Sequence, residues 1–301
     1  MESSYDNAEL SVSEGVLLGH ALVARIASEL GIRAFFIKGP VSVLQGLRPP
    51  KTSADVDVFV APQDLEVLVE ALQDRGWRER PVDPDSKTFP KHSITLDHGQ
   101  WPCCIDVHYR FPGMEAATQE CFEVMWKNTK RFVLAGQDIQ VPGKPLGILL
   151  LGLHALRSPQ LPACRRELGF LSDAVSQQSL ALSIQELSAA TGSLAAMRPL
   201  LEGHLAEHTA PAWPEPSLEW RNRLLAQEPG SARIIALFQA RWYDIPAILR
   251  RAVFPSRHAL LSRNIHADMS RKGQLLQHVA RWTRFLCSVP RIARNLKRYR
   301  A

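Results

Sequence analysis

The stretch Asp55-Val56-Asp57-Val58-Phe59-Val60 is the segment that decides the fold and the chemistry of this chain. Acidic and apolar residues alternate with the period of a β-strand, so Asp55 and Asp57 project from one face and the valines from the other. Two carboxylates this close raise each other's pKa unless a cation lies between them. A hard divalent ion such as Mg²⁺, which binds carboxylate and phosphate oxygens, removes that conflict. The alternative is a solvated acidic face on an edge strand.

A second alternating stretch, Ile105-Asp106-Val107-His108, places Asp106 and His108 together on one face of another predicted strand. A third carboxylate from a neighbouring strand is what a two-metal phosphoryl-transfer site needs, because it completes the ligands of one ion and can accept a proton from an attacking hydroxyl. The alternatives are a strand-end carboxylate in a local hydrogen bond for Asp106 and a structural histidine for His108.

A turn precedes both strands, at Lys38-Gly39-Pro40, after the apolar run of residues 34–37. The glycine would let the backbone approach a phosphate, and Lys38 adds a positive charge. Arg48 and Lys51 lie in the loop before the acid pair, where they can contact a triphosphate. The alternatives are an ordinary turn and solvated loop charges.

The order of elements around these motifs predicts an α+β fold. We expect helices at 10–30, 41–45 and 62–75, and strands at 34–37, 55–60, 93–97, 104–109, 131–134 and 139–141. From Pro145 onward the apolar residues recur at helical spacing. The sequence therefore predicts a small mixed-sheet domain at 1–143, followed by an all-α domain at 144–301.

Charge is concentrated at the end of the 301-residue chain. The net charge is +6, but residues 281–301 hold six Arg, one Lys and no acid, which leaves the rest near −1. Their apolar residues have amphipathic spacing, which predicts a basic helix kinked or broken at Pro290. Three interpretations stay open: docking on the protein itself, binding an acidic partner or RNA, and lying on an anionic membrane surface.

Composition narrows the class of protein further. With 46% hydrophobic and 22% charged residues, the chain has an ordinary globular composition. No stretch approaches the roughly 20 apolar residues of a transmembrane helix, and the acidic, polar start is unlike a secretory signal. Five cysteines suggest no disulfide framework. We therefore expect a reduced, cytoplasmic protein.

The order of the motifs resembles the uncharacterised nucleotidyltransferase family of the polymerase-beta superfamily. The motifs are Ile37-Lys38-Gly39, then Lys51 four residues before the Asp55-Val56-Asp57 strand, then Ile105-Asp106-Val107-His108. In the second half, Leu149-Leu150-Leu151-Gly152-Leu153-His154-Ala155, Glu167-Leu168-Gly169-Phe170-Leu171-Ser172-Asp173-Ala174 and Val253-Phe254-Pro255-Ser256 are also similar to the family's pattern. Two positions depart from it: Pro40 follows Gly39 where the superfamily usually has Ser or Gly, and Lys51 replaces an Arg.

The resemblance implies an enzyme that transfers a nucleoside monophosphate from an NTP to an acceptor hydroxyl or phosphate. Asp55, Asp57 and Asp106 would be the catalytic residues and would hold two Mg²⁺ or Mn²⁺ ions. The nucleotide side of the site would be formed by Lys38, Gly39, Lys51 and His108. The acceptor is left open among small molecules, peptides and RNA.

Two alternatives accompany this prediction. The chain can instead be a catalytically weak or inactive accessory protein of the same fold, which engages a peptide, RNA or protein partner through its basic tail. His154 and Asp173, on predicted helices, either face a cleft and contact base or acceptor, or form a buried hydrogen bond that joins the two helices.

Overall fold

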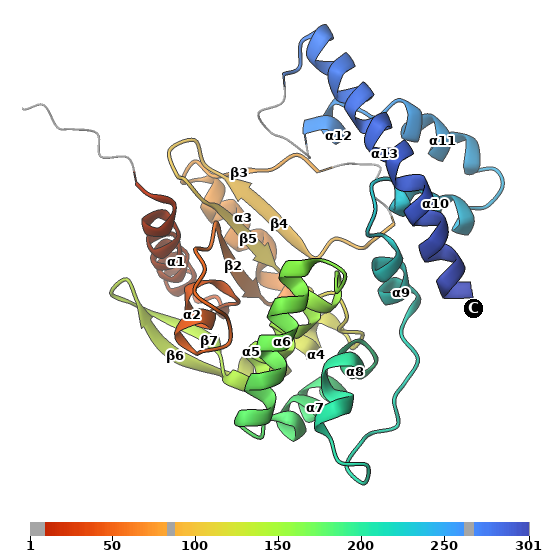
Figure 1. Ribbon diagram of the computed structural model, residues 1–301. Coiled ribbons are helices and arrows are strands. Elements are labelled where there is room, and N and C mark those ends of the chain that lie inside the picture. Colours follow the sequence, from red (N-terminus) through yellow and green to blue (C-terminus); the bar gives the residue numbers. More distant parts are fainter. Residues whose placement is uncertain (1–9, 83–87, 262–267, 301) are drawn as a thin grey trace, which may run out of the picture. The chain divides into compact units, whose positions relative to one another are not determined.

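The computed structural model describes residues 10–82, 88–261 and 268–300, and these form two compact units (Figure 1). The first unit comprises residues 1–79 and 92–214, and the second comprises 80–91 and 215–301, as far as they are described. The acidic start of the chain, residues 1–9, lies outside the described residues. None of the described helices is both long enough and apolar enough to cross a membrane.

A mixed five-stranded sheet forms the centre of the first unit. Its strands are β1 (Ala34–Phe36), β2 (Asp55–Val60), β3 (Arg78–Glu79), β4 (Ser93–Asp97) and β5 (Cys104–His108), in the order β1-β2-β5-β4-β3. Only β2 and β5 pair in parallel; the other neighbours are antiparallel. The predicted strands at 55–60 and 93–97 are confirmed, as is that at 104–109 to within one residue.

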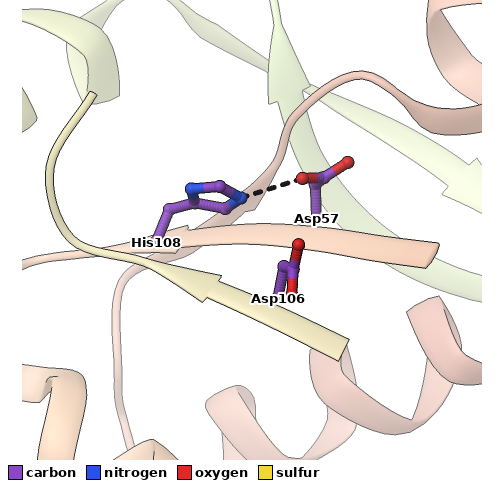
Figure 2. Close-up of side chains that lie close together, drawn as sticks. All are labelled: Asp57, Asp106 and His108. Carbon is purple, nitrogen blue, oxygen red and sulfur yellow. Dashed lines mark hydrogen bonds and ion pairs between the residues drawn. The ribbon is translucent and has the colours of Figure 1, made fainter. Parts of the chain in front are cut away.

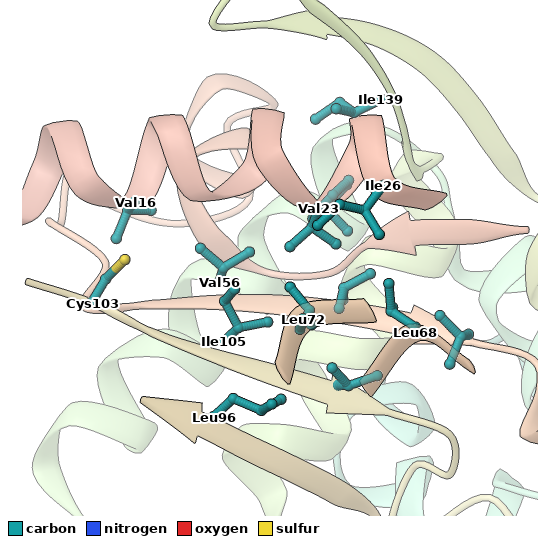
Figure 3. Close-up of a cluster of buried hydrophobic side chains, with 14 of the residues drawn as sticks. Val16, Val23, Ile26, Val56, Leu68, Leu72, Leu96, Cys103, Ile105 and Ile139 are labelled. Atoms are coloured by element: carbon teal, nitrogen blue, oxygen red, sulfur yellow. The ribbon is translucent and has the colours of Figure 1, made fainter. Parts of the chain in front are cut away.

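One face of this sheet is covered by α1 (Val12–Glu29) and α3 (Leu65–Gln73). Val56 and Ile105, which are register partners on β2 and β5, pack there against Val16, Val23, Leu72 and their neighbours (Figure 3). A fully buried side chain of this kind contributes about 1.5–3 kcal/mol. A slip of one residue would expose the whole apolar set, so burial fixes which carboxylates share the opposite face.

Local signals account for the helix boundaries in this unit. Ser11 caps α1 in a reciprocal capping box with Glu14, which fixes its start. The short helix α2 (Gly39–Leu44) follows the Lys-Gly turn, and a single 3-10 turn, η1 (Pro62–Asp64), precedes α3. The predicted helices at 10–30, 41–45 and 62–75 are confirmed with these adjusted ends.

Helix α4 (Thr118–Lys127) and a hairpin complete the α/β part. The hairpin pairs β6 (Thr129–Leu134) with β7 (Gln137–Pro142), so both strands are longer than predicted. Helix α5 (Lys144–Leu156) begins directly after β7, packs against it, and is buried along nearly its whole length.

Three helices surround α5: α6 (Pro162–Gln177), α7 (Ala181–Ala190) and α8 (Leu194–Leu201), the last followed by η2 (Glu202–His204). The change from strands to helices thus falls at 143 and 144, where the domain boundary was predicted. Both sides of that point belong to the first compact unit, since α5 packs on the hairpin. The proposed domains 1–143 and 144–301 stay a prediction about folding units. The α+β class itself is confirmed.

The regular elements described in the second unit are helices, and its short described stretches at 80–82 and 88–91 have no regular structure. The unit contains α9 (Leu218–Leu225), α10 (Ser231–Gln239), α11 (Ile245–Val253), α12 (Arg257–Leu261) and α13 (Arg271–Arg300). The sequence predicted a kink or a break at Pro290; the break is wrong, because α13 continues through this residue, and the kink stays a prediction. Pro290 deprives the Leu286 carbonyl of its helical partner, but both residues are exposed, so water can replace the missing donor.

Candidate functional site

Strands β2 and β5 present their polar side chains on the face opposite α1 and α3. Asp57 and Asp106 are register partners on the parallel pair, and His108 lies two residues further along β5. The alternation that buries Val56 and Val58 on one face places Asp57 on the other. Phe59 and His108 stack with parallel rings on that face, and Phe122 of α4 stacks on Phe59.

Asp57, Asp106 and His108 form a compact group of three ligand-bearing side chains (Figure 2). One ligand atom from each lies within 4.8 Å of the others, and Nε2 of His108 is 2.8 Å from Oδ1 of Asp57. Asp57 and His108 are buried, whereas Asp106 is half-buried. Two carboxylate oxygens and an imidazole nitrogen at this separation can share one divalent ion.

Two atoms of this group lack a hydrogen-bond partner among the described residues. They are Oδ1 of Asp106 and Nδ1 of His108, both inaccessible to solvent. Leaving a buried polar atom unpaired costs about 1–3 kcal/mol, and more when the atom carries charge. An unpaired carboxylate oxygen beside a second carboxylate is explained by a cation that binds it. The donor set therefore fits a divalent metal.

Lys38 supplies the positive charge closest to this group. Its Nζ lies 2.7 Å from Oδ1 of Asp57, in an ion pair whose side chains are 12% and 3% exposed. Burial by itself would raise the pKa of Asp57, but the Lys38 charge and the His108 hydrogen bond outweigh burial and hold that pKa well below its usual value. Asp57 is thus ionised and ready to bind a cation at neutral pH.

Asp55 lies at the start of β2, outside the group of three but within its electrostatic reach. Burial raises the pKa of Asp55, and the negative charges of Asp57 and Asp106 raise it further. Counting three carboxylates against the Lys38 ammonium, with His108 neutral, leaves a formal charge of −2. A divalent cation would neutralise that charge.

The predicted phosphate-binding turn has the expected backbone but a different environment. Gly39 adopts φ +58°, and a Cβ there would lie 3.3 Å from Nε2 of His20. The buried His20 ring therefore explains the need for glycine without reference to a ligand. Lys38 itself has φ 60° and is turned toward Asp57. Helix α2 has only six residues, so its macrodipole would stabilise an anion at its N-terminus only weakly.

The two basic residues of the following loop have separate environments. Lys51 is exposed, as a residue free to meet a substrate would be. Arg48 forms an ion pair with Glu167 of α6, 2.7 Å between Nε and Oε1, and both side chains are largely buried. The interpretation of Arg48 as a solvated loop charge is therefore wrong: Arg48 ties the loop to the helical part of the unit.

His154 of α5 lies in the same electrostatic environment. Burial lowers its pKa well below the usual value, and the Lys38 and Arg157 charges add to that effect while Asp57 opposes it. Its Nδ1 is 2.6 Å from Nη2 of Arg157. Asp173 is exposed on α6, so a buried hydrogen bond between His154 and Asp173 is not what holds these helices together.

The structure brings Asp57, Asp106 and His108 together, with Lys38 paired to Asp57, a pairing that the sequence motifs did not predict. His108 was assigned to the nucleotide, whereas its contact is with Asp57; the period-two position shared by Asp106 and His108 was the signal for this. Lys38 was assigned to phosphate, and its ion pair with Asp57 had no signal in the sequence. The catalytic, metal-binding and nucleotide-binding roles assigned to these residues, and to Asp55, Gly39 and Lys51, all stay predictions.

Comparison with known proteins finds distant similarity to solved structures. No family model and no curated protein matches the chain. Among solved structures, the antibiotic-resistance factor ANT(2'')-Ia is 14% identical over 65% of this chain and 100% of its own, with a TM-score of 0.39. An antigenic nucleotidyltransferase-like protein from Paracoccidioides brasiliensis is 14% identical over 64% and 92%, with a TM-score of 0.39.

The lincosamide antibiotic adenylyltransferase LnuA, solved with lincomycin bound, is a third neighbour. It is 14% identical over 44% of this chain and 82% of its own, with a TM-score of 0.31. The three neighbours are, in turn, an antibiotic-resistance factor, a nucleotidyltransferase-like protein and an adenylyltransferase. Likenesses this distant carry no argument about activity, which has to rest on the geometry of the site itself.

Proposed function

We propose that this chain is a metal-dependent nucleotidyltransferase, which moves a nucleoside monophosphate from an NTP to an acceptor hydroxyl or phosphate. The observation that carries the proposal is the group formed by Asp57, Asp106 and His108, whose ligand atoms lie within 4.8 Å of one another on adjacent parallel strands. The buried, unpaired Oδ1 of Asp106 supports it, because a polar atom in that position is costly unless a cation or substrate binds it.

Asp57, Asp106 and His108 would hold one divalent ion, and Asp55 would help to hold a second one beside Asp57. Carboxylate oxygens suit Mg²⁺ and Mn²⁺ alike, but an imidazole ligand suits a transition metal better. We therefore expect Mn²⁺ to bind more tightly than Mg²⁺. Bound at this position, such an ion would neutralise charge on the triphosphate and on the leaving pyrophosphate.

The protein's own groups would carry out the proton transfer and the positioning. Asp106 has a carboxylate oxygen with no competing hydrogen bond, so it is suited to accept the proton of an attacking hydroxyl. His108 bonds to Asp57 and would fix the direction of that carboxylate. Lys38 would reach phosphate oxygens only after its ion pair with Asp57 opens, while Lys51 is exposed and unobstructed in the loop before β2.

Labelled NTPs test the proposal directly. Purified protein is incubated with Mn²⁺, an NTP labelled at the α- or the γ-phosphate, and host extract separated into small-molecule, RNA and protein fractions. Nucleotidyl transfer predicts that the α label enters one fraction and that the γ label leaves as pyrophosphate. Asp106→Asn should abolish this incorporation, whereas Asp173→Asn, the same change at an exposed carboxylate, should not.

Two results would count against nucleotidyl transfer. Incorporation of the γ label would indicate phosphoryl transfer instead. Absence of any α label in every fraction, from a protein that also binds no NTP, would favour the accessory protein of the same fold. The turn Gly39-Pro40 is the sequence feature on which that alternative rests.

A further inference from the structure

Helix α13 packs on the second unit with one face only. The ring of Phe285 lies against Gly230 at the start of α10, where a Cβ would collide with it. Arg281 donates hydrogen bonds to the carbonyl oxygens of Ala252 and Val253, at the end of α11. Ser288 and Ile292, one and two turns beyond Phe285, are buried. The docked face of α13, which packs on the rest of the second unit, thus consists of residues three or four positions apart: Arg281, Phe285, Ser288 and Ile292.

Within the described part of the second unit, a second apolar face of α13 stays exposed. Its residues recur every three or four positions and are all exposed: Leu275, Val279, Trp282, Leu286 and Val289. At 1.5 Å per residue, the stripe extends over roughly 21 Å. Leu286 keeps 63% of its surface accessible, far more than a helix in a globular core would leave. Self-docking therefore accounts for one side of this helix and leaves the other unexplained.

Helix α11 extends this surface. The hydrogen bonds from Arg281 hold the end of α11 beside α13, at the level of Trp282. Val253 and Phe254 are exposed at that end, Phe254 to 74%. We name the combined surface the apolar ridge and define it as Leu275, Val279, Trp282, Leu286 and Val289 of α13 together with Val253 and Phe254. Exposed apolar surface gathered in this way marks an interaction site.

Charge restricts what can cover the apolar ridge. Helix α13 contains nine Lys and Arg residues and no Asp or Glu. Among its described basic side chains, Arg271, Lys272 and Arg294 are exposed on the ridge side of the helix or at its edge, whereas Arg284 and Arg291 are exposed on the opposite side. A second copy of α13 would bring like charges together, so self-association through the ridge is disfavoured. The partner surface should be anionic and should accept apolar side chains.

Aromatic residues favour a lipid surface over an acidic protein. Trp242 is 82% exposed, and Tyr243 beside it is also exposed, in the turn that leads into α11. Tryptophan and tyrosine with exposed rings, apolar side chains and flanking arginines are the features of helices that lie in the headgroup region of a bilayer. We propose that the second unit binds the surface of an anionic lipid bilayer through the apolar ridge and the basic residues beside it.

Vesicle binding by the full chain tests this proposal. The protein is sedimented with vesicles of phosphatidylcholine alone or of phosphatidylcholine mixed with phosphatidylglycerol. We expect at least tenfold stronger partitioning into the anionic vesicles, and weakening as salt is raised, because screened charges attract less. Leu286→Glu and Phe254→Glu should each reduce partitioning at least tenfold. Both residues are largely exposed, so neither change disturbs packing; circular dichroism verifies this.

Matched controls separate the ridge from general surface effects. Val133, on β6 in the first unit, is 64% exposed, and Val133→Glu should leave vesicle binding within twofold of wild type. Lys272→Glu, at an exposed basic residue that borders the ridge, should weaken binding to the anionic vesicles only. Equal binding of wild type to both vesicle types, or equal binding of wild type and Leu286→Glu, would overturn the proposal.

Other occupants of the ridge give distinguishable results. A dimer in sedimentation velocity that Leu286→Glu dissociates, without vesicle binding, would assign the ridge to a second copy of the chain and overturn the proposal. Binding to RNA or to an acidic polypeptide with no affinity for anionic vesicles would overturn it as well. Vesicle binding does not depend on nucleotidyl transfer, so the two proposals can fail separately.

Discussion

Replacing Lys38 with methionine tests whether the carboxylates of the site need a cation. Lys38 Nζ lies 2.7 Å from Oδ1 of Asp57, and the two side chains are 12% and 3% exposed, so solvent screens the pair little. Removing one partner of a buried ion pair costs about 3–5 kcal/mol, since the other charge stays buried. Because His108 still bonds to Asp57, we expect a loss near the lower limit, about 3 kcal/mol.

The assay is thermal unfolding in EDTA and in Mn²⁺. In EDTA, a loss of about 3 kcal/mol should lower the Tm of Lys38→Met by roughly 6–12 °C for a unit of this size. In Mn²⁺ at a hundred times its Kd, binding adds about 2.7 kcal/mol, which should restore most of that loss. Methionine replaces another residue with a Cβ, so the strain of the positive φ at position 38 is unchanged.

Lys51→Met is the matched control for this experiment. It removes the same charge at an exposed residue of the loop, and its Tm in EDTA should stay within about 2 °C of wild type, because exposed charges contribute little. The reasoning is refuted if Lys38→Met and Lys51→Met lose the same stability in EDTA. It is also refuted if the Tm of Lys38→Met is no higher in Mn²⁺ than in EDTA.

Three further predictions concern the site and its surroundings. Asp106→Asn should lower nucleotidyl transfer at least about 10²-fold, yet urea unfolding without metal should show equal or higher stability, because a charge that repels Asp55 is removed. Burial raises the pKa of the Cys121 thiol to about 11, so mass spectrometry should find iodoacetamide on the exposed Cys287 long before Cys121. Burial also lowers the pKa of His20, so the unfolded chain takes up a proton first as pH falls below about 6.5. The free energy of unfolding should then decrease with falling pH, by at most about 1.4 kcal/mol per unit, and His20→Gln should flatten that dependence.

The sequence predicted the strands of the site because their signal is local. Asp55 to Val60 alternate over six residues, and the burial of Val56 and Val58 enforces the same alternation in the structure. The pairing of Asp57 with Asp106 depends on the register of β2 and β5, which are separated in the chain by α3 and two further strands, β3 and β4. That register follows from the packing of the whole apolar face, which single motifs do not contain.

The sequence motifs did not predict side-chain contacts between segments that are far apart in the chain. Arg48 and Glu167 are far apart in the sequence, and neither has a local pattern that selects the other. The direction of Lys38 depends on a backbone conformation, φ 60°, that residue type alone does not predict. The apolar ridge could not be predicted from the sequence for a related reason. Helix α13 has two apolar faces, and only the packing shows which of them is docked.

The most direct test of the central claim is pulsed electron paramagnetic resonance of bound Mn²⁺. If Asp57, Asp106 and His108 hold the ion, its spectrum should show coupling to an imidazole nitrogen that disappears in His108→Gln, and Asp106→Asn should weaken Mn²⁺ binding at least tenfold. A bound Mn²⁺ without nitrogen coupling, or one held equally well by Asp106→Asn, would contradict the assignment of this group as the metal site.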